Sequence, residues 1–242
     1  MSNQKGVGDG RVTLDGRLLT VAALVRQGAV FADIGTDHAY LPLYLLQKGH
    51  ITRAYASDVA RGPLERARRN VMAAGLLARV TLLLADGLAG MEGYGLTDIA
   101  ICGMGGEVIA SILSRAPFVK DPSVRLILQP MTRVPLLRKY LYENGFTVEE
   151  ERVAASSGKI YFCLAATYGA PPRVPTETEI EIGAPRLICE EEKRAYLAYL
   201  GAQERVIGKR LAGKRKGGLP TEEEETLLRA LLLERERVDY DG

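Results

Sequence analysis

The sequence predicts an α/β fold built on a mostly parallel sheet. Between residues 29 and 130, five short apolar segments recur, each followed by a glycine or proline signal and then by a helical pattern. These segments are almost continuous in apolar residues, as is typical of strands buried on both faces of a parallel sheet. With 242 residues, 47% of them hydrophobic, the chain can form one large domain or a domain with an appendage.

The predicted elements follow one another in a regular order. A first helix is expected from Leu14 to Val25, where apolar residues recur at helical spacing. The expected strands are 29–35, 53–58, 79–86, 97–103 and 124–130. The helix after the second strand has Pro63 in its first turn and Gly75 as its stop signal. This alternation indicates repeated βα units.

Residues 146–168 break the alternation, because two strand-like runs flank a turn with no helix between them. We interpret them as an antiparallel hairpin that closes the sheet. Five βα units followed by a terminal hairpin make up the seven-stranded topology of class I methyltransferases.

A proline-rich stretch, "GAPPRVPTE" (169–177), marks a predicted domain boundary. Residues 1–170 form the first predicted domain, and residues 171–242 form a C-terminal antiparallel helical hairpin that resembles a coiled coil. Its helices are expected from about 189 to 211 and from 221 to 238, the second starting with the capping-box spacing of Thr221 and Glu224. All predicted strands precede residue 170, so the first domain should fold alone unless packing of these helices on the sheet is essential.

Composition excludes several classes of protein. The net charge of +2 does not by itself require a polyanionic partner. The three cysteines are far apart and there are only two histidines, which argues against a disulfide framework and against a metal site. No apolar leader or run of about 18 apolar residues is present. We therefore expect a soluble cytoplasmic protein without metal or membrane partners.

The stretch "FADIGTDHAYLP" (31–42) resembles the start of a nucleotide site, with Asp33 and Gly35 at the end of a strand. In a dinucleotide fold, however, Asp37 would replace the second glycine and oppose the pyrophosphate charges, and Tyr40 would replace the third. S-adenosyl-L-methionine carries a sulfonium and an ammonium group and no phosphate, so nearby carboxylates suit it. This cofactor is therefore favoured over NAD, and an NAD-dependent oxidoreductase is disfavoured.

Later strand ends extend the predicted cofactor site. Asp58, with its neighbour Val59, ends the second strand where an acid accepts hydrogen bonds from ribose hydroxyls. Asp86-Gly87 ends the third strand, where it can contact the adenine edge. After the fourth strand, "CGMGGE" brings Gly103, Met104 and Gly105 close to the ligand. Each acid alone is commonly a turn or cap residue, but the ordered set favours a cofactor site.

"DIGTDHAYLP", the "GMGGE" turn and the "LILQP" strand end, together with the C-terminal helical hairpin, resemble the bacterial tRNA (adenine22-N1)-methyltransferases. The resemblance covers the chain from Leu14 onward. It implies a class I methyltransferase domain, a coiled-coil-like C-terminal domain, and transfer of the methyl of S-adenosyl-L-methionine to adenine N1 in the D-arm region of tRNA.

The catalytic candidates follow from this chemistry. Adenine N1 is already nucleophilic, so the enzyme mainly has to align it, and methylation leaves a cation on the base. Asp37, His38 and Tyr40 could stabilise that cation or take a proton, although His38 equally fits a packing or capping role. Gln129 could bond the adenine edge. The Asn/Asp-Pro-Pro-aromatic motif of exocyclic-amine methyltransferases is absent, which favours a ring nitrogen.

RNA binding requires Lys and Arg for the phosphates. The densest basic cluster is predicted at the tip of the helical hairpin, and Lys159 in the sheet hairpin could also reach substrate. The cluster comprises Lys209, Arg210, Lys214, Arg215 and Lys216. These charges also fit a helix C-terminus, and residues 171–242 carry 13 basic and 15 acidic residues, so a role in helix stability remains open. Arg66, Arg68 and Arg69 are interpreted as a solvated helix face.

Some alternatives remain open at this stage. The acceptor could be another RNA base or a small molecule, because nothing in the sequence describes the acceptor side of the cavity. A catalytically silent RNA-binding protein is a third possibility. We expect a monomer, with a dimer through the helical hairpin not excluded.

Overall fold

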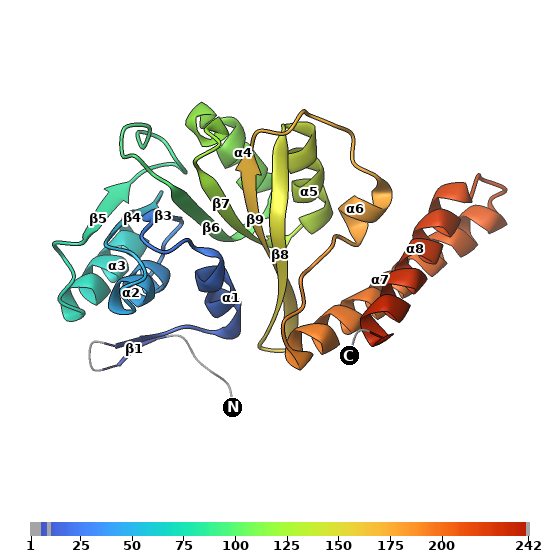
Figure 1. Cartoon of the computed structure of the whole chain (residues 1–242), viewed down its shortest axis with the longest axis horizontal. Coiled ribbons are helices and arrows are strands. Elements are labelled where there is room, and N and C mark those ends of the chain that lie inside the picture. Colours follow the sequence, from blue (N-terminus) through green and yellow to red (C-terminus); the bar gives the residue numbers. More distant parts are fainter. Residues whose placement is uncertain (1–5, 9–10, 241–242) are drawn as a thin grey trace.

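The computed structural model describes residues 6–8 and 11–240, and its centre is a seven-stranded sheet with strand order β5-β4-β3-β6-β7-β9-β8 (Figure 1). The strands are β3 (Val30–Ile34), β4 (Arg53–Asp58), β5 (Val80–Leu84), β6 (Asp98–Gly105), β7 (Arg125–Thr132), β8 (Phe146–Ser156) and β9 (Lys159–Tyr168). β3 to β7 are parallel, and β9 pairs antiparallel with both β7 and β8. The predicted sheet, including its terminal hairpin, is confirmed.

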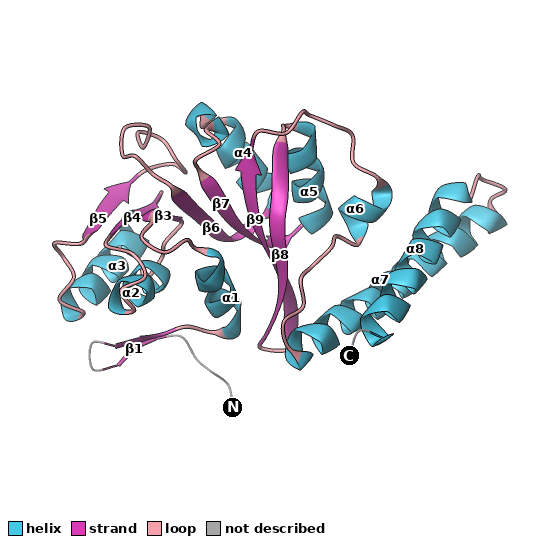
Figure 2. Cartoon of the chain, viewed as in Figure 1, coloured by secondary structure: helices cyan, strands magenta, loops and turns pink. Residues whose placement is uncertain are grey.

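Helices cover both faces of this sheet (Figure 2). One layer contains α1 (Gly16–Leu24), α2 (Tyr40–Gln47) and α3 (Arg61–Ala73). The other contains α4 (Gly106–Ser114), the 3₁₀ helix η1 (Pro117–Lys120) and α5 (Val134–Glu143). Because strand side chains alternate between faces, Phe31 packs in the first layer and Ala32 in the second. The continuous apolar strands predicted from the sequence are explained by this double burial.

A small antiparallel pair precedes the first helix and was not predicted. β1 (Gly6–Gly8) pairs with β2 (Arg11–Thr13), and the backbone N–H of Val12 donates to Gln47 Oε1 of α2 at 3.0 Å. Runs of three residues are too short to give a periodic signal in the sequence. This pair attaches the start of the described chain to the first helical layer.

The C-terminal region contains α6 (Glu177–Glu181), α7 (Glu190–Lys216) and α8 (Glu222–Tyr240). The two predicted long helices are confirmed, but the expected end of the first at residue 211 is wrong: α7 continues to Lys216. The hydroxyl of Thr221 contacts Glu225 rather than Glu224. A capping box forms instead at Thr176 and Glu179, at the start of α6.

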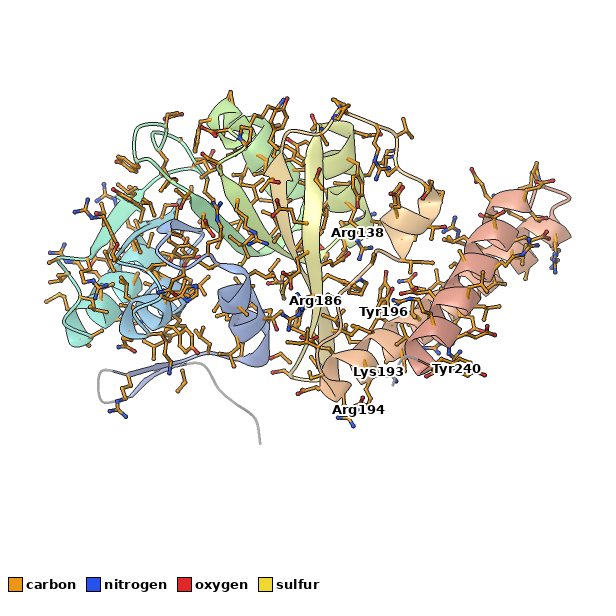
Figure 3. The ribbon with its side chains drawn as sticks, in the orientation of Figure 1. Arg138, Arg186, Lys193, Arg194, Tyr196 and Tyr240 are labelled. Carbon is orange, nitrogen blue, oxygen red and sulfur yellow. The ribbon has the colours of Figure 1, made fainter. Side chains whose placement is uncertain are left out.

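The C-terminal helices pack against the sheet through a buried contact that we call the arm seam, made by Arg138, Glu151, Arg152, Glu192 and Tyr196. The Arg138 guanidinium donates to Glu151 Oε1 at 2.5 Å and to the carbonyl of Ile180 at 2.7 Å. Arg152 pairs with Glu192 of α7, also at 2.5 Å. Figure 3 shows Arg138 and Tyr196 on the side of β8 that faces α6 and α7. The proline-rich stretch is therefore followed by helices that share the core of the sheet.

Candidate functional site

The loop after β3 shapes the site. Gly35 has a φ of +76°, a backbone angle that favours glycine, and a Cβ there would lie 2.3 Å from Met104 Cε, so that the end of the methionine side chain would have to move. Asp37 and Ala39 also have positive φ, at 31° and 57°. Positive φ in non-glycine residues is uncommon and is concentrated at functional loops. The loop after β3 therefore has a backbone conformation that the sequence pattern alone did not indicate.

A cavity of about 330 Å³ lies at the carboxyl ends of β4 and β5 and contains most of the residues predicted to bind cofactor. It is lined by Gly35, Asp58, Val59, Asp86, Gly87, Met104 and residues of α4. One oxygen of Asp58, Oδ1, accepts the N–H of Ala60 at 2.8 Å. The other oxygen, Oδ2, accepts no hydrogen bond from the residues that the structure describes.

Asp86 lies in the same cavity in a different electrostatic setting. Arg115, the residue directly after α4, donates to both of its carboxylate oxygens, at 2.7 and 3.2 Å. These hydrogen bonds and the charge of Arg115 lower the pKa of Asp86 from its ordinary value. Next to it, a Cβ on Gly87 would lie 3.0 Å from Ile112, so the backbone there passes close to α4. Asp58 and Asp86 thus differ in how far their carboxylates are already used.

A second cavity, of about 290 Å³, adjoins the first through Gly35. Its lining includes Arg17, Asp33, Thr36, Asp37, His38, Tyr40, Cys102, Gly103 and Met131. Asp33 is buried, and Thr36 Oγ1 donates to it at 2.5 Å. The structure therefore brings Asp33, Asp37, His38, Tyr40 and Gly103 together around one space, as the sequence predicted for a site at the sheet edge.

Residues 14–164 match the protein family described as "Methyltransferase domain". The tRNA (adenine(22)-N(1))-methyltransferase of Bacillus subtilis is 37% identical over 156 residues, which are 64% of this chain and 66% of that relative, just under two thirds of its length. A Streptococcus pneumoniae structure titled "putative tRNA (m1A22) methyltransferase" is 32% identical, covers 93% of this chain and 99% of that chain, and has a TM-score of 0.73.

The chain belongs to the tRNA (adenine(22)-N(1))-methyltransferase family. A second structure of the S. pneumoniae protein, in complex with S-adenosyl-L-methionine, is 31% identical, with 89% of this chain and 96% of that chain covered and a TM-score of 0.73. The resemblance stated from the sequence motifs is confirmed.

Within this methyltransferase fold, Asp37 lies at the mouth of the second cavity. Arg66 of α3 donates to Asp37 Oδ1 at 2.6 and 3.1 Å, and His38 Nε2 lies 3.4 Å from Oδ2. The side chain of Asp37 is 53% exposed, so the ion pair leaves it accessible to solvent and ligand. The rings of His38 and Tyr40 stack with centroids 4.9 Å apart and an interplanar angle of 3°. His38 therefore has two partners that the sequence did not show.

Gln129 lies behind the cavity rather than on its surface. It is fully buried, and its oxygen accepts the backbone N–H of Gly103 at 3.1 Å and a guanidinium N–H of Arg17. Its nitrogen donates to the carbonyl of Pro130 at 2.9 Å. Since both ends of the amide are engaged, Gln129 orients the Gly103 turn and Arg17 and has no free edge for a base. The expected bond to adenine does not fit this geometry.

Arg17 is the lining residue that the sequence analysis missed. It lies in the first turn of α1, and its guanidinium reaches Gln129 and the ring of Tyr161, 5.9 Å away. The one local signal is a cation in the first turn of a helix, where the dipole disfavours positive charge. The sequence separation of 112 residues from Gln129 could not be read from any pattern.

The glycine turn after β6 serves packing as much as ligand approach. Gly103 has a φ of +80°, and its N–H is the one held by Gln129. Met104 lines the first cavity, whereas Gly105 lies against Glu107 and Thr132. A Cβ on Gly106 would lie 2.4 Å from the carbonyl of Arg133. The structure thus places Gly103 and Met104 at the cavities and Gly105 beside them.

None of the predicted RNA-contacting residues lines either of the two cavities. Lys159 is exposed directly after the turn at Ser157 and Gly158. The hairpin-tip cations sit in the last turns of α7, where three of them pair with glutamates of α8. Lys214 Nζ lies 2.6 Å from Glu224 Oε2, and Arg210 lies 3.1 Å from Oε1 of the same residue. Arg215 pairs with Glu225 at 2.8 Å. Lys209 and Lys216 are exposed.

The other functions considered for the chain are metal binding, membrane insertion, and chemistry at His50 or at the Cys163 thiol. Within the described ranges 6–8 and 11–240, no group of three or more His, Cys, Asp and Glu side chains could hold a metal ion. No helix in that part of the chain combines the length and apolar character that crossing a membrane requires. His50 Nε2 contacts the carbonyl of Val25 at 2.7 Å, a structural role. Burial raises the pKa of the Cys163 thiol to about 12, so this thiol stays protonated.

Proposed function

We propose that the protein transfers the methyl group of S-adenosyl-L-methionine to N1 of adenine 22, in the D-arm region of tRNA. The observation that carries this proposal is the 32% identity, along 93% of the chain, with the S. pneumoniae protein described as a putative tRNA (m1A22) methyltransferase. The geometry also supports it, because two adjoining cavities offer space for the nucleoside part of the cofactor in the first and for its methionine part beside an acceptor base in the second.

The donor set suits S-adenosyl-L-methionine. Asp58 offers a carboxylate oxygen to the ribose hydroxyls, and the backbone at Gly87 lies where the adenine edge would rest. Asp33 and Asp37 place negative charge near the position of the sulfonium and ammonium groups. Arg17 supplies the one cation among the residues lining the second cavity, and it suits the cofactor carboxylate. When bound, the cofactor supplies an electrophilic methyl group.

The protein's own residues then align the acceptor and respond to its charge. A neutral adenine N1 has a free lone pair, so the main requirement is an in-line approach with the base turned out of its stack. Asp37 lies at the mouth of the second cavity, where its charge stabilises the cation that methylation leaves on the base. The stacked rings of His38 and Tyr40 form one wall of that cavity. Gln129 holds Gly103 and Arg17 in place from behind.

The expected setting follows from the substrate. Because the proposed substrate is tRNA, we propose that the protein acts in the cytoplasm. Because a single chain contains both cavities, we propose a monomer as the active form. Sedimentation at assay concentration tests this: a dimer that persists on dilution contradicts it.

Incubation of the protein with labelled S-adenosyl-L-methionine and unmodified tRNA transcripts tests the proposed activity. We expect label in transcripts that carry adenine at position 22, mapped to that base, and none when the base is replaced by guanine. Label on another base would move the acceptor. Label on small molecules of a cell extract, with none on tRNA, would overturn the RNA assignment.

A further inference from the structure

Helix α3 exposes a row of arginines beside the second cavity. It contains Arg61, Arg66, Arg68 and Arg69 and a single acid, Glu65. Arg61, Arg68 and Arg69 are exposed, and among the residues that the structure describes none of the three has a carboxylate within 4.0 Å. We call Arg61, Arg68 and Arg69 the α3 arginine face. It is a concentration of positive charge that intramolecular ion pairs do not neutralise.

Helix stability does not account for this charge. Arg61 is the first residue of α3, at the end where the helix dipole disfavours a cation, and the last turn of α3 has no basic residue. Helix α7 shows the opposite arrangement, with Glu190, Glu191 and Glu192 in its first turn and basic residues in its last. The cations in the last turn of α7 therefore stabilise their own helix, whereas Arg61 opposes the dipole of α3, and Arg68 and Arg69 lie outside the last turn, where a cation would stabilise it. A function outside the folded chain is a better explanation for the α3 arginine face.

The α3 helix is fixed to the loop that shapes the second cavity. Arg66 contacts Asp37 at 2.6 Å, and the side-chain nitrogen of Asn70 donates to the carbonyl of His38 at 2.9 Å. These contacts hold the helix that carries the α3 arginine face against the loop at the second cavity. Figure 1 shows α3 near one end of the long axis of the molecule and the tip of α7 and α8 at the other.

We propose that the α3 arginine face binds backbone phosphates of the RNA next to the base that enters the second cavity; this rests on the proposed function. Arginine suits this role because its guanidinium binds phosphate in a planar, two-pronged geometry and is always charged. The interpretation of Arg68 and Arg69 as a merely solvated face is thereby replaced. At the hairpin tip, by contrast, Arg210, Lys214 and Arg215 already bind carboxylates of α8.

Two matched triple variants of the full-length protein test the proposal. The first is Arg61→Gln/Arg68→Gln/Arg69→Gln. The control is Arg205→Gln/Lys209→Gln/Lys216→Gln, which removes three exposed cations from α7 and leaves the ion pairs with α8 intact. The dissociation constant of an unmodified tRNA transcript is measured at several salt concentrations for both variants and the wild type. S-adenosylhomocysteine affinity, measured by calorimetry, checks the fold.

Each phosphate contact contributes roughly 0.7 to 0.9 to the slope of log K against log salt, so the α3 variant should lower that slope by about 2 or more. The control should lower it by less than about 1. Both variants should bind S-adenosylhomocysteine as the wild type does. A slope change in the α3 variant no larger than that of the control would overturn the proposal. Methylation of adenine 22 by the wild-type protein is measured in parallel. A failure of the proposed activity is thereby distinguished from a failure of the α3 arginine face to bind RNA.

Discussion

Acid–arginine pairs occur both at the carboxyl edge of the sheet and in the arm seam, but the two sets differ in burial and in role. At the sheet edge, Asp37 and Asp86 each meet an arginine, but both carboxylates remain more than half exposed. In the seam, Glu151 and Glu192 also meet arginines, and all four side chains are less than a tenth exposed. An exposed acid can still contact a ligand, less freely where an arginine already holds both of its oxygens, as at Asp86, whereas an acid paired in the core cannot. Burial therefore separates binding residues from structural ones where residue identity does not.

The seam should give the largest effect. Arg138→Ala would leave Glu151 buried without its partner, and removing one member of a buried pair costs about 3–5 kcal/mol. We expect the free energy of unfolding in urea to fall by that amount. The double variant Arg138→Met/Glu151→Leu should recover part of the loss, because no charge is then left unpaired. Recovery is incomplete because the carbonyl of Ile180 and the N–H of Ala184 lose partners. An Arg138→Ala variant with the same free energy of unfolding as the wild type would show that the arm seam does not stabilise the core.

At the sheet edge, Asp58→Ala should weaken binding of S-adenosyl-L-methionine by about 1.5–3 kcal/mol, the usual contribution of hydrogen bonds to a charged group. Calorimetry measures the dissociation constant. Asp86→Ala is the matched control, because its carboxylate is already bound by Arg115, and we expect a smaller loss. An unchanged affinity in the Asp58 variant would remove that residue from the site.

Asp37→Asn should lower the methylation rate about tenfold, which corresponds to roughly 1.4 kcal/mol of transition-state stabilisation, and leave the fold intact. Asparagine tolerates the positive φ of this position, so the loop should keep its shape. Single-turnover rates with saturating tRNA and cofactor measure the effect, and an unchanged melting temperature is the control for the fold. Wild-type turnover in this variant would make Asp37 a loop residue only.

The smallest effect is expected at Glu179, where the region after the sheet begins. Hydrogen bonds from Arg173, followed by that from the Thr176 backbone, lower its pKa from 4.5 to about 2. Because the folded-state pKa lies below the unfolded one, the ionised carboxylate stabilises the fold above about pH 4.5, and that stabilisation disappears as the pH falls towards 2. Glu179→Gln should therefore melt earlier than wild type at pH 6, and the two melting temperatures should converge at pH 2. A constant difference across this range would contradict the assignment.

The strands, their succession along the chain and the strand-end acids were predictable from the sequence for a local reason. A strand buried on both faces must be apolar throughout, and polar residues resume where it ends, so Asp33, Asp58 and Asp86 mark the edge at which parallel strands meet. The preference for S-adenosyl-L-methionine over NAD followed from Asp37, since a carboxylate in place of a glycine disfavours a pyrophosphate. These inferences needed only neighbouring residues and the period of the backbone.

The partners of the charged side chains were decided by tertiary structure alone. Arg17 meets Gln129 across 112 residues, Arg66 meets Asp37 across 29, and Arg152 meets Glu192 across 40. The cations at the end of α7 formed a cluster in the sequence, yet the return of α8 neutralises Arg210, Lys214 and Arg215, while the α3 arginine face stays without carboxylate partners among the described residues. Composition determines how many charges a chain carries, but an ion pair depends on distances of a few ångströms, and those distances exist only once the elements have packed.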